Sequence, residues 1–236
     1  MITVVTAESR QGLATWTPSI SRTTHLYLYD NLLRELSEAI GTLRDLRVLD
    51  LAGNELTRLP PAIGQCTRLE YLYLHGNRLD RLPQQLGRLS RLVYLNVNLN
   101  ALGGLPDSLG GLGHLAELRA ESAALTAIPP AVGELPRLRE LHLRDNLISD
   151  LPGAADSWPD LRYLNLRDNR LTDFPRALAG SPRLRELDLR QNAIGHLPPF
   201  LLALPALDKV DARWNAIPVT DPIAVRLRDR GCLVHL

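Results

Sequence analysis

A unit of 23 residues repeats along most of this chain and constrains its fold more than any other feature. The segment from Leu46 to Arg68 returns at regular 23-residue steps with no insertion between copies. Later copies begin at Leu69, Leu92, Leu115, Leu138, Leu161, Leu184 and Leu207, and a degenerate first copy begins at Thr23. Nine consecutive copies predict a solenoid in which each unit packs on its neighbours, so the chain length of 236 residues does not imply separate globular domains.

Each copy has the same internal pattern, which predicts a short strand, a turn and a slim return segment. Position 1 is leucine in eight of the nine copies, positions 4 and 6 are apolar, and position 9 is asparagine in eight. Positions 3 to 7 alternate with the period of two that a strand requires. Twenty-three residues cannot hold a strand and a full α-helix, so we expect the proline common at position 15 to open an extended return with one helical turn.

The pattern LxxLxLxxNxLxxLPxxIGxL resembles the leucine-rich repeat family over residues 23–218. Within that family it is similar to the intracellular Ras-group proteins and their bacterial counterparts. The resemblance implies an α/β repeat solenoid, a right-handed horseshoe with a parallel β-sheet on the concave side and short 3-10 or extended segments on the convex side. It also implies a binding scaffold, without naming a partner.

The first 22 residues do not fit the repeat, and we expect them to form an N-terminal cap. The β-branched segment Ile2–Val5 predicts a strand, and Leu13–Trp16 is its expected partner across a polar turn. Trp16 and Ile20 are the expected apolar plugs over the first repeat. A repeat stack needs such a cover because its end repeats otherwise expose core and an unpaired strand edge.

Residues 219–236 predict a C-terminal cap made of a helix and a final strand. Asp221 is the expected N-cap, Pro222 the first helical residue, and the helix continues over Ile223–Arg230. The strand follows in Cys232–Leu236. With both ends capped, we expect one structural domain and a complete chain.

The asparagine at position 9 is interpreted as structural. Its amide can bond backbone groups of its own turn and of the neighbouring copy, so the side chains would form a ladder. The rungs are Asn31, Asn54, Asn77, Asn100, Asn146, Asn169, Asn192 and Asn215. The fifth copy has Ala123 instead, and Ser122 is a candidate replacement. Leu99 adds an apolar residue beside this gap, which is explained either by sequence drift or by a local docking point.

Composition argues for a soluble cytoplasmic protein. The net charge is +1, so no global field attracts nucleic acid or an anionic membrane. No apolar run reaches the ~18 to 20 residues of a membrane span, and no Sec signal is visible. Two distant cysteines and the lack of disulfide-rich caps favour a reducing compartment, although delivery into a host cell by another secretion route stays open. We expect a monomer.

No catalytic or metal-binding constellation is found, so we predict neither enzyme activity nor a cofactor or metal. Phosphate loops, GxSxG, CxxC and HExxH are absent. The six histidines are spread over separate copies or caps, and only His75 and His142 are assigned to the hollow. At about 4.8 Å per strand these two are roughly 14 Å apart, too far to share an ion.

Tyrosines dominate the face predicted to line the hollow, which consists of positions 3, 5 and 7. Five of the six tyrosines lie there in the first four copies, and the sixth lies there in the seventh. Tyrosine is typical of interface hot spots because it combines apolar area with a polar tip, although it also suits any exposed strand. Two asparagines follow the tyrosines on this face. The predicted contact residues in this group are Tyr27, Tyr29, Tyr71, Tyr73, Tyr94, Asn96, Asn98 and Tyr163.

The later copies place charges on the same face. An arginine column, Arg144, Arg167, Arg190 and Arg213, occupies position 7, with acids Glu140, Glu186, Asp188 and Asp211 at positions 3 and 5. Two interpretations stay open: salt bridges across strands, or an arginine column that receives acidic or phosphorylated side chains of a partner. The interleaved acids disfavour nucleic acid. The remaining predicted contacts are Arg119, His142 and the rim residue Trp214.

We therefore predict a non-catalytic scaffold that binds a partner protein through its concave face, in a bacterial adaptor or a secreted effector. The alternative is a small-molecule or glycan-binding module that uses the tyrosines.

Overall fold

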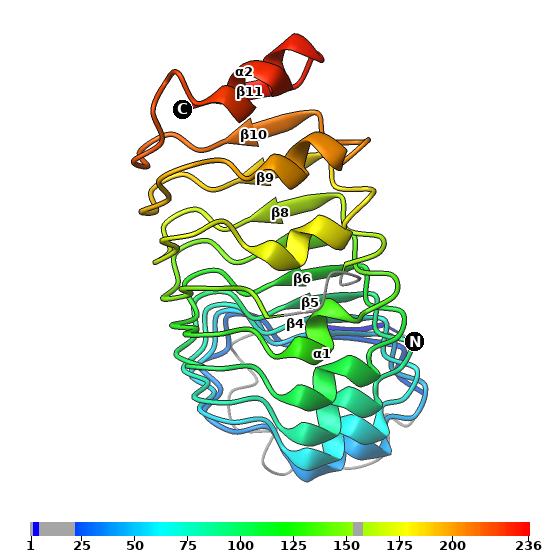
Figure 1. Cartoon of the computed structure of the whole chain (residues 1–236). Helices are drawn as coiled ribbons and strands as arrows, with labels where there is room; N and C mark the ends of the chain where they lie inside the picture. Colours follow the sequence, from blue (N-terminus) through cyan, green and yellow to red (C-terminus); the bar gives the residue numbers. More distant parts are fainter. Residues whose placement is uncertain (1, 5–21, 153–157) are drawn as a thin grey trace.

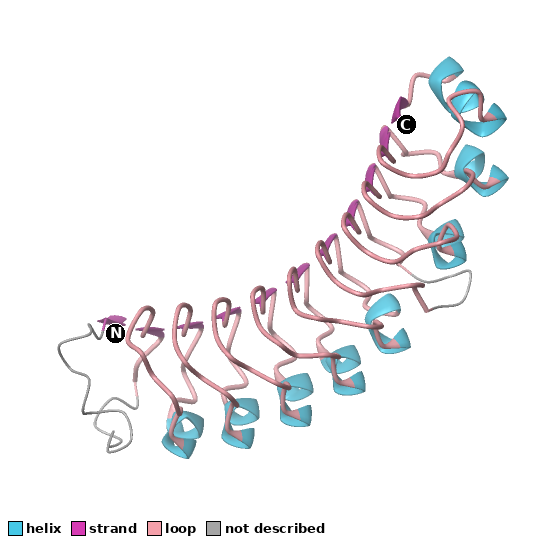
Figure 2. Ribbon diagram, turned by 90° about the vertical axis from the view of Figure 1, so that its left-hand side faces the viewer, coloured by secondary structure: helices cyan, strands magenta, loops and turns pink. Residues whose placement is uncertain are grey.

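The chain forms a curved solenoid in a computed structural model (Figure 1). The structure describes residues 2–4, 22–152 and 158–236. Its strands form one sheet of eleven, all parallel and arranged in chain order. Figure 2 shows the strands along the inner curve and the short helices along the outer one. The predicted α/β repeat solenoid is confirmed.

The strands are three residues each and begin at position 3 of each copy. Leu26 lies opposite Leu49 and Leu49 opposite Leu72, so residues 23 apart are direct neighbours. The strands are β1 Ile2–Val4, β2 His25–Tyr27, β3 Val48–Asp50, β4 Tyr71–Tyr73, β5 Tyr94–Asn96, β6 Glu117–Arg119, β7 Glu140–His142, β8 Tyr163–Asn165, β9 Glu186–Asp188, β10 Lys209–Asp211 and β11 Leu233–His235.

The convex side is as slim as the repeat length requires. It consists of η3 Glu38–Thr42, η4 Pro61–Gln65, η5 Gln84–Arg88, η6 Asp107–Gly111, the single α-turn α1 Pro130–Gly133, η7 Arg176–Gly180 and η8 Pro199–Ala203. Glycine at position 19 lets these turns stack closely. A Cβ on Gly87 would lie 2.0 Å from the carbonyl oxygen of Ser108 in the next copy, and one on Gly64 would lie 2.4 Å from that of Gln85.

One hydrophobic core runs the length of the solenoid between the sheet and the convex turns. The leucines at positions 4 and 6, such as Leu72 and Leu74, are fully buried. Truncating one of them to alanine costs roughly 2–5 kcal/mol, because neighbouring copies cannot collapse around the space that is left. The core therefore sets the rigid spacing at which the concave side chains stand.

The asparagine ladder is present, and each rung after the first bonds the preceding copy. The Nδ2 group of Asn54 donates to the carbonyls of Leu28 and Leu51, and its Oδ1 accepts from the backbone N–H groups of Asn31 and Leu33. The same pattern recurs at later rungs such as Asn146, where Oδ1 accepts from Leu125 N–H.

At the gap in the ladder the expectation for Ser122 is wrong. Its hydroxyl donates to Asp145 at 2.7 Å and does not replace the missing amide. The reason is backbone direction, because Ser122 lies in the left-handed region with φ 50° at the rim, whereas Ala123 points into the core and is fully buried. Leu99 beside the gap is 60% exposed.

The two ends of the described sheet are strands of non-repeat sequence. At the first end β1 pairs in parallel with β2; its predicted partner Leu13–Trp16 and the plugs Trp16 and Ile20 lie outside the described residues. At the other end, helix α2 covers Pro222–Asp229, one residue shorter than expected, and β11 pairs with β10. Asp221 caps the helix by accepting from the N–H groups of Ile223 and Ala224.

Candidate functional site

The concave face carries a group of three tyrosines in adjacent strands β4 and β5, called here the tyrosine patch: Tyr71, Tyr73 and Tyr94. The ring centroids of Tyr73 and Tyr94 are 5.0 Å apart, and those of Tyr71 and Tyr94 are 6.5 Å apart. Tyr71 is 38% exposed and the other two are partly exposed. The rings therefore support one another on a rigid sheet and leave part of each ring accessible to a partner.

Two phenols of the tyrosine patch, those of Tyr73 and Tyr94, stay neutral at physiological pH. Burial raises the pKa of Tyr73, and the neighbouring Tyr94 and Asp50 raise it further. Burial also raises the pKa of Tyr94, whose hydroxyl accepts a hydrogen bond from the Asn96 amide. Each hydroxyl can therefore donate a hydrogen bond to a partner without bringing a charge to the surface.

The other tyrosines share this face but lie outside the tyrosine patch. Tyr27 and Tyr29 belong to the first copy, and strand β3 separates them from β4. Tyr163 lies in β8, where its ring centroid is 5.0 Å from that of His142. The placement of all six tyrosines on the face lining the hollow agrees with the period-two pattern; their role in binding stays a prediction.

The arginine column at position 7 is largely paired. Arg190 forms two parallel hydrogen bonds with Asp188, and Arg213 does the same with Asp211. Arg167 donates to the side-chain oxygen of Gln191.

The salt-bridge interpretation placed the pairs across strands, but the closest ones link residues two apart within one copy. Across strands, Arg190 Nε is 3.6 Å from Asp211. Binding of a partner's acids by the arginine column stays a prediction. Of its four members Arg144 is exposed, and the other three are half-buried. The Nε of Arg144 is 3.6 Å from Asp168.

Histidine placement differs from the prediction in two ways. His25 also lies on the concave face, as the first residue of β2, because it occupies position 3; its ring stacks on Tyr27 at 6.4 Å. His142 has acidic neighbours, with its Nε2 3.3 Å from Glu140 and 3.9 Å from Glu117.

Glu117, Glu140 and His142 are the one group among the described residues whose potential metal-ligand atoms all lie within 4.8 Å of each other. The 23-residue register placed Glu117 beside Glu140, so this grouping could have been found from the sequence. Arg119 already pairs with Glu117, which reduces the negative charge of the group.

The rim next to the face is built from left-handed backbone. Position 8 has a positive φ in every copy, and glycine occupies it only as Gly53 and Gly76. Bulky residues at this conformation cost roughly 1–2 kcal/mol each. Two of them, Leu99 and Trp214, are also 60% exposed.

Trp214 has the guanidinium of Arg213 at 5.2 Å from its ring centroid and that of Arg167 at 6.0 Å. Trp214 is exposed at the rim, as predicted. The two guanidinium groups near its ring stabilise its position.

Comparison with known families supports the repeat assignment. The leucine rich repeat model matches residues 21–79, 67–125 and 136–194, which together make up more than half of the chain. The chain belongs to the leucine-rich repeat family. A search of curated proteins found no match to the sequence.

Solved structures of this family have the same architecture. An internalin (InlF) from Listeria monocytogenes is 20% identical with a TM-score of 0.76, over 90% of this chain and 60% of its own. YopM from Yersinia enterocolitica is 26% identical with a TM-score of 0.66, over 85% of this chain and 40% of its own. A Leptospira interrogans LRR protein is 21% identical with a TM-score of 0.58, over 91% of this chain and 84% of its own. The chain thus spans only part of the first two proteins.

The thiols of this leucine-rich repeat protein are unsuited to nucleophilic chemistry. Burial raises the pKa of Cys66 to about 11, and its Sγ donates to the carbonyl of Ile40. Burial also raises the pKa of Cys232. A protonated thiol is a poor nucleophile, so neither cysteine is a candidate for catalysis. Among the described residues no helix is long and apolar enough to cross a membrane.

Proposed function

We propose that this leucine-rich repeat protein is a non-catalytic scaffold that binds a partner protein through its concave face, with the tyrosine patch at the centre of the contact. The family is typically used for protein–protein interaction. The observation that carries the proposal is the tyrosine patch itself: three partly exposed rings in tilted contact on a rigid sheet. Such rings lose little rotamer entropy on binding, so more of the contact energy appears as affinity.

The charged half of the face would orient the partner. Its carboxylates and arginines are already paired, as in Arg190 with Asp188 and Arg213 with Asp211. Pairs of this kind contribute little affinity but penalise a partner whose charges do not match. Trp214 at the rim offers an apolar anchor beyond the last pair.

The test begins with crosslinking mass spectrometry in the native cell to identify the partner, followed by binding measurements with purified partner. The double variant Y71A/Y73A should fold normally and bind at least about thirtyfold more weakly, the loss of one hot spot of 2 kcal/mol. Y163A, which removes the same side-chain type from the same face outside the tyrosine patch, should change affinity less than about fivefold. Unchanged binding by the double variant would show that the tyrosine patch is not the contact.

A small-molecule or glycan site is the second candidate, and one hollow favours it. A cavity of about 390 Å³ opens beside the tyrosine patch, lined by Tyr29, Asp50 and His75 among others. It exists because the rim residues there are Gly53 and Gly76, without side chains. The Nδ1 atom of His75 is buried with no hydrogen-bond partner. Specific thermal shifts with a ligand library, abolished in H75A and combined with no captured protein, would favour this candidate.

We further propose a monomeric bacterial adaptor or secreted effector that works in the cytoplasm, of the producing cell or of a host. Support comes from the likeness to bacterial leucine-rich repeat proteins, including YopM at 26% identity, and from an arginine-rich composition with Lys209 as the single lysine. Fractionation of the producing culture tests this proposal: export of an epitope-tagged chain supports the effector, and full retention in the cells supports the adaptor.

A further inference from the structure

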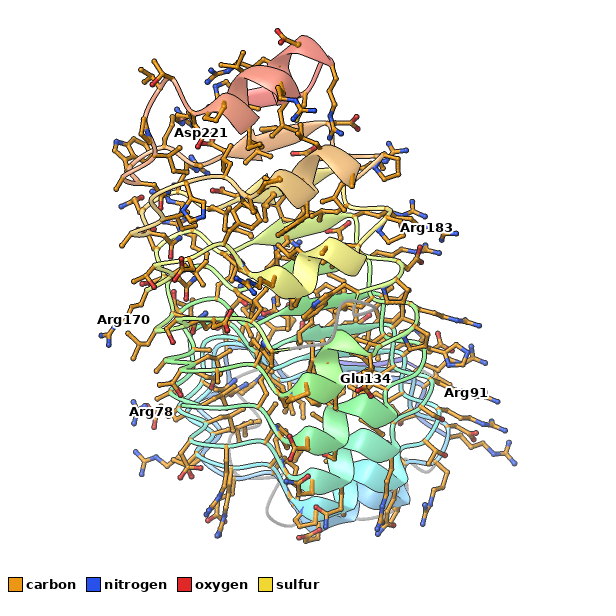
Figure 3. All side chains as sticks on the ribbon, in the orientation of Figure 1. Arg78, Arg91, Glu134, Arg170, Arg183 and Asp221 are labelled. Carbon is orange, nitrogen blue, oxygen red and sulfur yellow. The ribbon has the colours of Figure 1, made fainter. Side chains whose placement is uncertain are left out.

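The edge of the sheet where the strands begin carries a compact set of charges that the concave site does not use. It is called here the arginine grid and consists of Arg137, Arg139, Asp160, Arg162, Arg183 and Arg185. These residues flank the buried leucines that open the sixth, seventh and eighth copies, at the entrances to β7, β8 and β9. In Figure 3, Arg183 and Arg91 project from this edge, whereas Arg78 and Arg170 project from the opposite edge.

The arginine grid has two rows that follow the repeat register. In one row, Arg162 N–H donates to the carbonyl of Arg139 at 2.8 Å, and Arg185 N–H donates to that of Arg162 at 2.9 Å. Three arginines therefore stand on directly adjacent rungs, about 4.8 Å apart. The second row, two residues earlier in each copy, is Arg137, Asp160 and Arg183. Like charges on neighbouring rungs repel one another, so this arrangement costs stability unless an anion offsets it.

A single carboxylate lies within the arginine grid and organises part of it. Asp160 is only 8% exposed and accepts hydrogen bonds from Arg139 Nε at 3.1 Å and from Arg183. Arg162 lies 4.0 Å away. Desolvation raises the pKa of Asp160, but the bonds from Arg183 and Arg139 outweigh it, and the net shift is downward. Asp160 is therefore ionised and holds these arginines in defined orientations.

The arginine grid remains strongly under-neutralised. The arginine grid contains five guanidinium groups and one carboxylate, a formal charge of +4 in a chain whose net charge is +1. Within the described part of the chain, neither Arg137 nor Arg185 takes part in an ion pair. The arginines that contact Asp160 are about half exposed, with side-chain values of 53% for Arg139 and 63% for Arg183. Arg139 bonds Asp160 through Nε, and its two terminal nitrogens make no hydrogen bond to the described residues.

We propose that the arginine grid binds a cluster of anionic oxygens on a protein partner, supplied by a phosphorylated or multiply acidic segment. Guanidinium forks bind phosphate and carboxylate oxygens in pairs, and preorientation by Asp160 lowers the entropy that binding costs. The arginine grid spans three rungs, about 10 Å, which suits a short peptide segment. A nucleic-acid strand would extend past it to Asp208, which follows Arg185 on the next rung and would repel phosphates.

The arginine grid is separate from the proposed concave site. The arginine grid lies at the strand entrances of β7 to β9, whereas the tyrosine patch lies on β4 and β5. A variant of one should leave the other intact, so the two proposals fail separately.

The test measures binding of short fluorescent Gly-Ser peptides to the full chain by anisotropy at low and physiological salt. One peptide carries two phosphoserines, one carries glutamates at the same places, and one is unmodified. We expect the phosphorylated peptide, the glutamate peptide or both to bind at least about tenfold more tightly than the unmodified one, and the ranking identifies the source of the anion. Binding should weaken as salt rises.

The decisive variant is R137Q/R185Q, which removes two positive charges and leaves the contacts of Asp160 in place. It should lose at least about tenfold in affinity for the anionic peptide, with a thermal melt no lower than that of the wild type. The matched control R78Q/R170Q removes two exposed arginines from the opposite edge and should bind as the wild type does. Three outcomes would overturn the proposal. R137Q/R185Q could bind as tightly as wild type, or neither anionic peptide could be preferred over the unmodified one. A single-stranded oligonucleotide of matched charge could also bind as tightly as the anionic peptides.

Discussion

Replacing Asn77 with alanine removes one rung from the middle of the ladder and tests how the repeats are held together. Its Nδ2 group donates to the carbonyls of Leu51 and Leu74, both at 2.9 Å, and its Oδ1 accepts from Leu56 N–H at 3.0 Å. All of these groups are buried, so water cannot easily replace the lost amide.

The structure shows that these losses are unequal. The Leu51 carbonyl also accepts from Asn54, and the Leu74 carbonyl also accepts from Asn100. Both carbonyls therefore keep a partner in the variant, and only the Leu56 N–H is left without one. A buried unpaired donor costs about 1–3 kcal/mol, so N77A should lose about that amount of unfolding free energy. For a chain of this size the loss corresponds to roughly 2–12 °C in melting temperature.

The assay is urea denaturation followed by circular dichroism, with N215A as the comparison. Asn215 makes the same kind of bonds, to the Leu189 carbonyl and the Ile194 N–H, but it is only half-buried. Water can reach the groups it leaves, so N215A should cost less than N77A. The comparison requires that wild type and both variants have similar slopes of unfolding free energy against urea concentration. A change of slope would indicate that the repeats no longer unfold as one cooperative unit.

A cost of more than about 5 kcal/mol or less than about 0.5 kcal/mol for N77A would contradict this account of the ladder. The first outcome would mean that the shared carbonyls do not compensate, and the second that the buried N–H finds another acceptor. The natural gap follows the same logic. Around Ala123 the carbonyls of Val97 and Ala120 keep Asn100 and Asn146 as donors, and only Leu102 N–H loses the amide acceptor that its counterparts have. One missing rung is therefore tolerable.

Three further outcomes follow from the packing and charges. L99G should raise the melting temperature slightly, by the equivalent of less than about 1 kcal/mol, because relief of positive φ exceeds the extra chain entropy of glycine; a lower melting temperature would contradict the strain argument. G87A should destabilise by at least about 2 kcal/mol in chemical denaturation, since its Cβ would lie 2.0 Å from the carbonyl oxygen of Ser108, and near-neutral stability would disprove this close stacking. Desolvation raises the pKa of Asp211, but hydrogen bonds from Arg213 outweigh this effect, and the net shift of the pKa is downward. The stability that ionised Asp211 contributes is therefore present above about pH 4 and lost as pH falls further. Melts of D211N should therefore depend less on pH between about pH 5 and pH 2 than those of wild type, and parallel curves would contradict this linkage.

Much of the fold follows from the repeat alone, because parallel pairing of identical units makes residues 23 apart neighbours. The leucine positions, the sheet and the slim convex side were all predictable on this basis. The cap of Asp221 on helix α2 lies outside the repeat and was predictable from the local Asp221-Pro222 pattern. The placement of the tyrosines on one face followed from period two. The arginine grid obeys the same register and was equally open to prediction, but counting charges over the whole chain concealed it, since a net charge of +1 averages a basic edge with acidic surfaces elsewhere.

The sequence by itself determined which residues share a face and which rungs adjoin, since both depend only on spacing. The tertiary structure decided which groups bond to each other. Arg190 bonds to Asp188 of its own copy, Glu140 lies beside His142, and the Ser122 hydroxyl points away from the ladder. Ladder carbonyls between two asparagine rungs, such as that of Leu51, accept from both amides. Those choices depend on side-chain rotamers and on competition between neighbours in three dimensions. The sequence pattern shows which groups could bond to each other, and only the packed solenoid determines which of those bonds form.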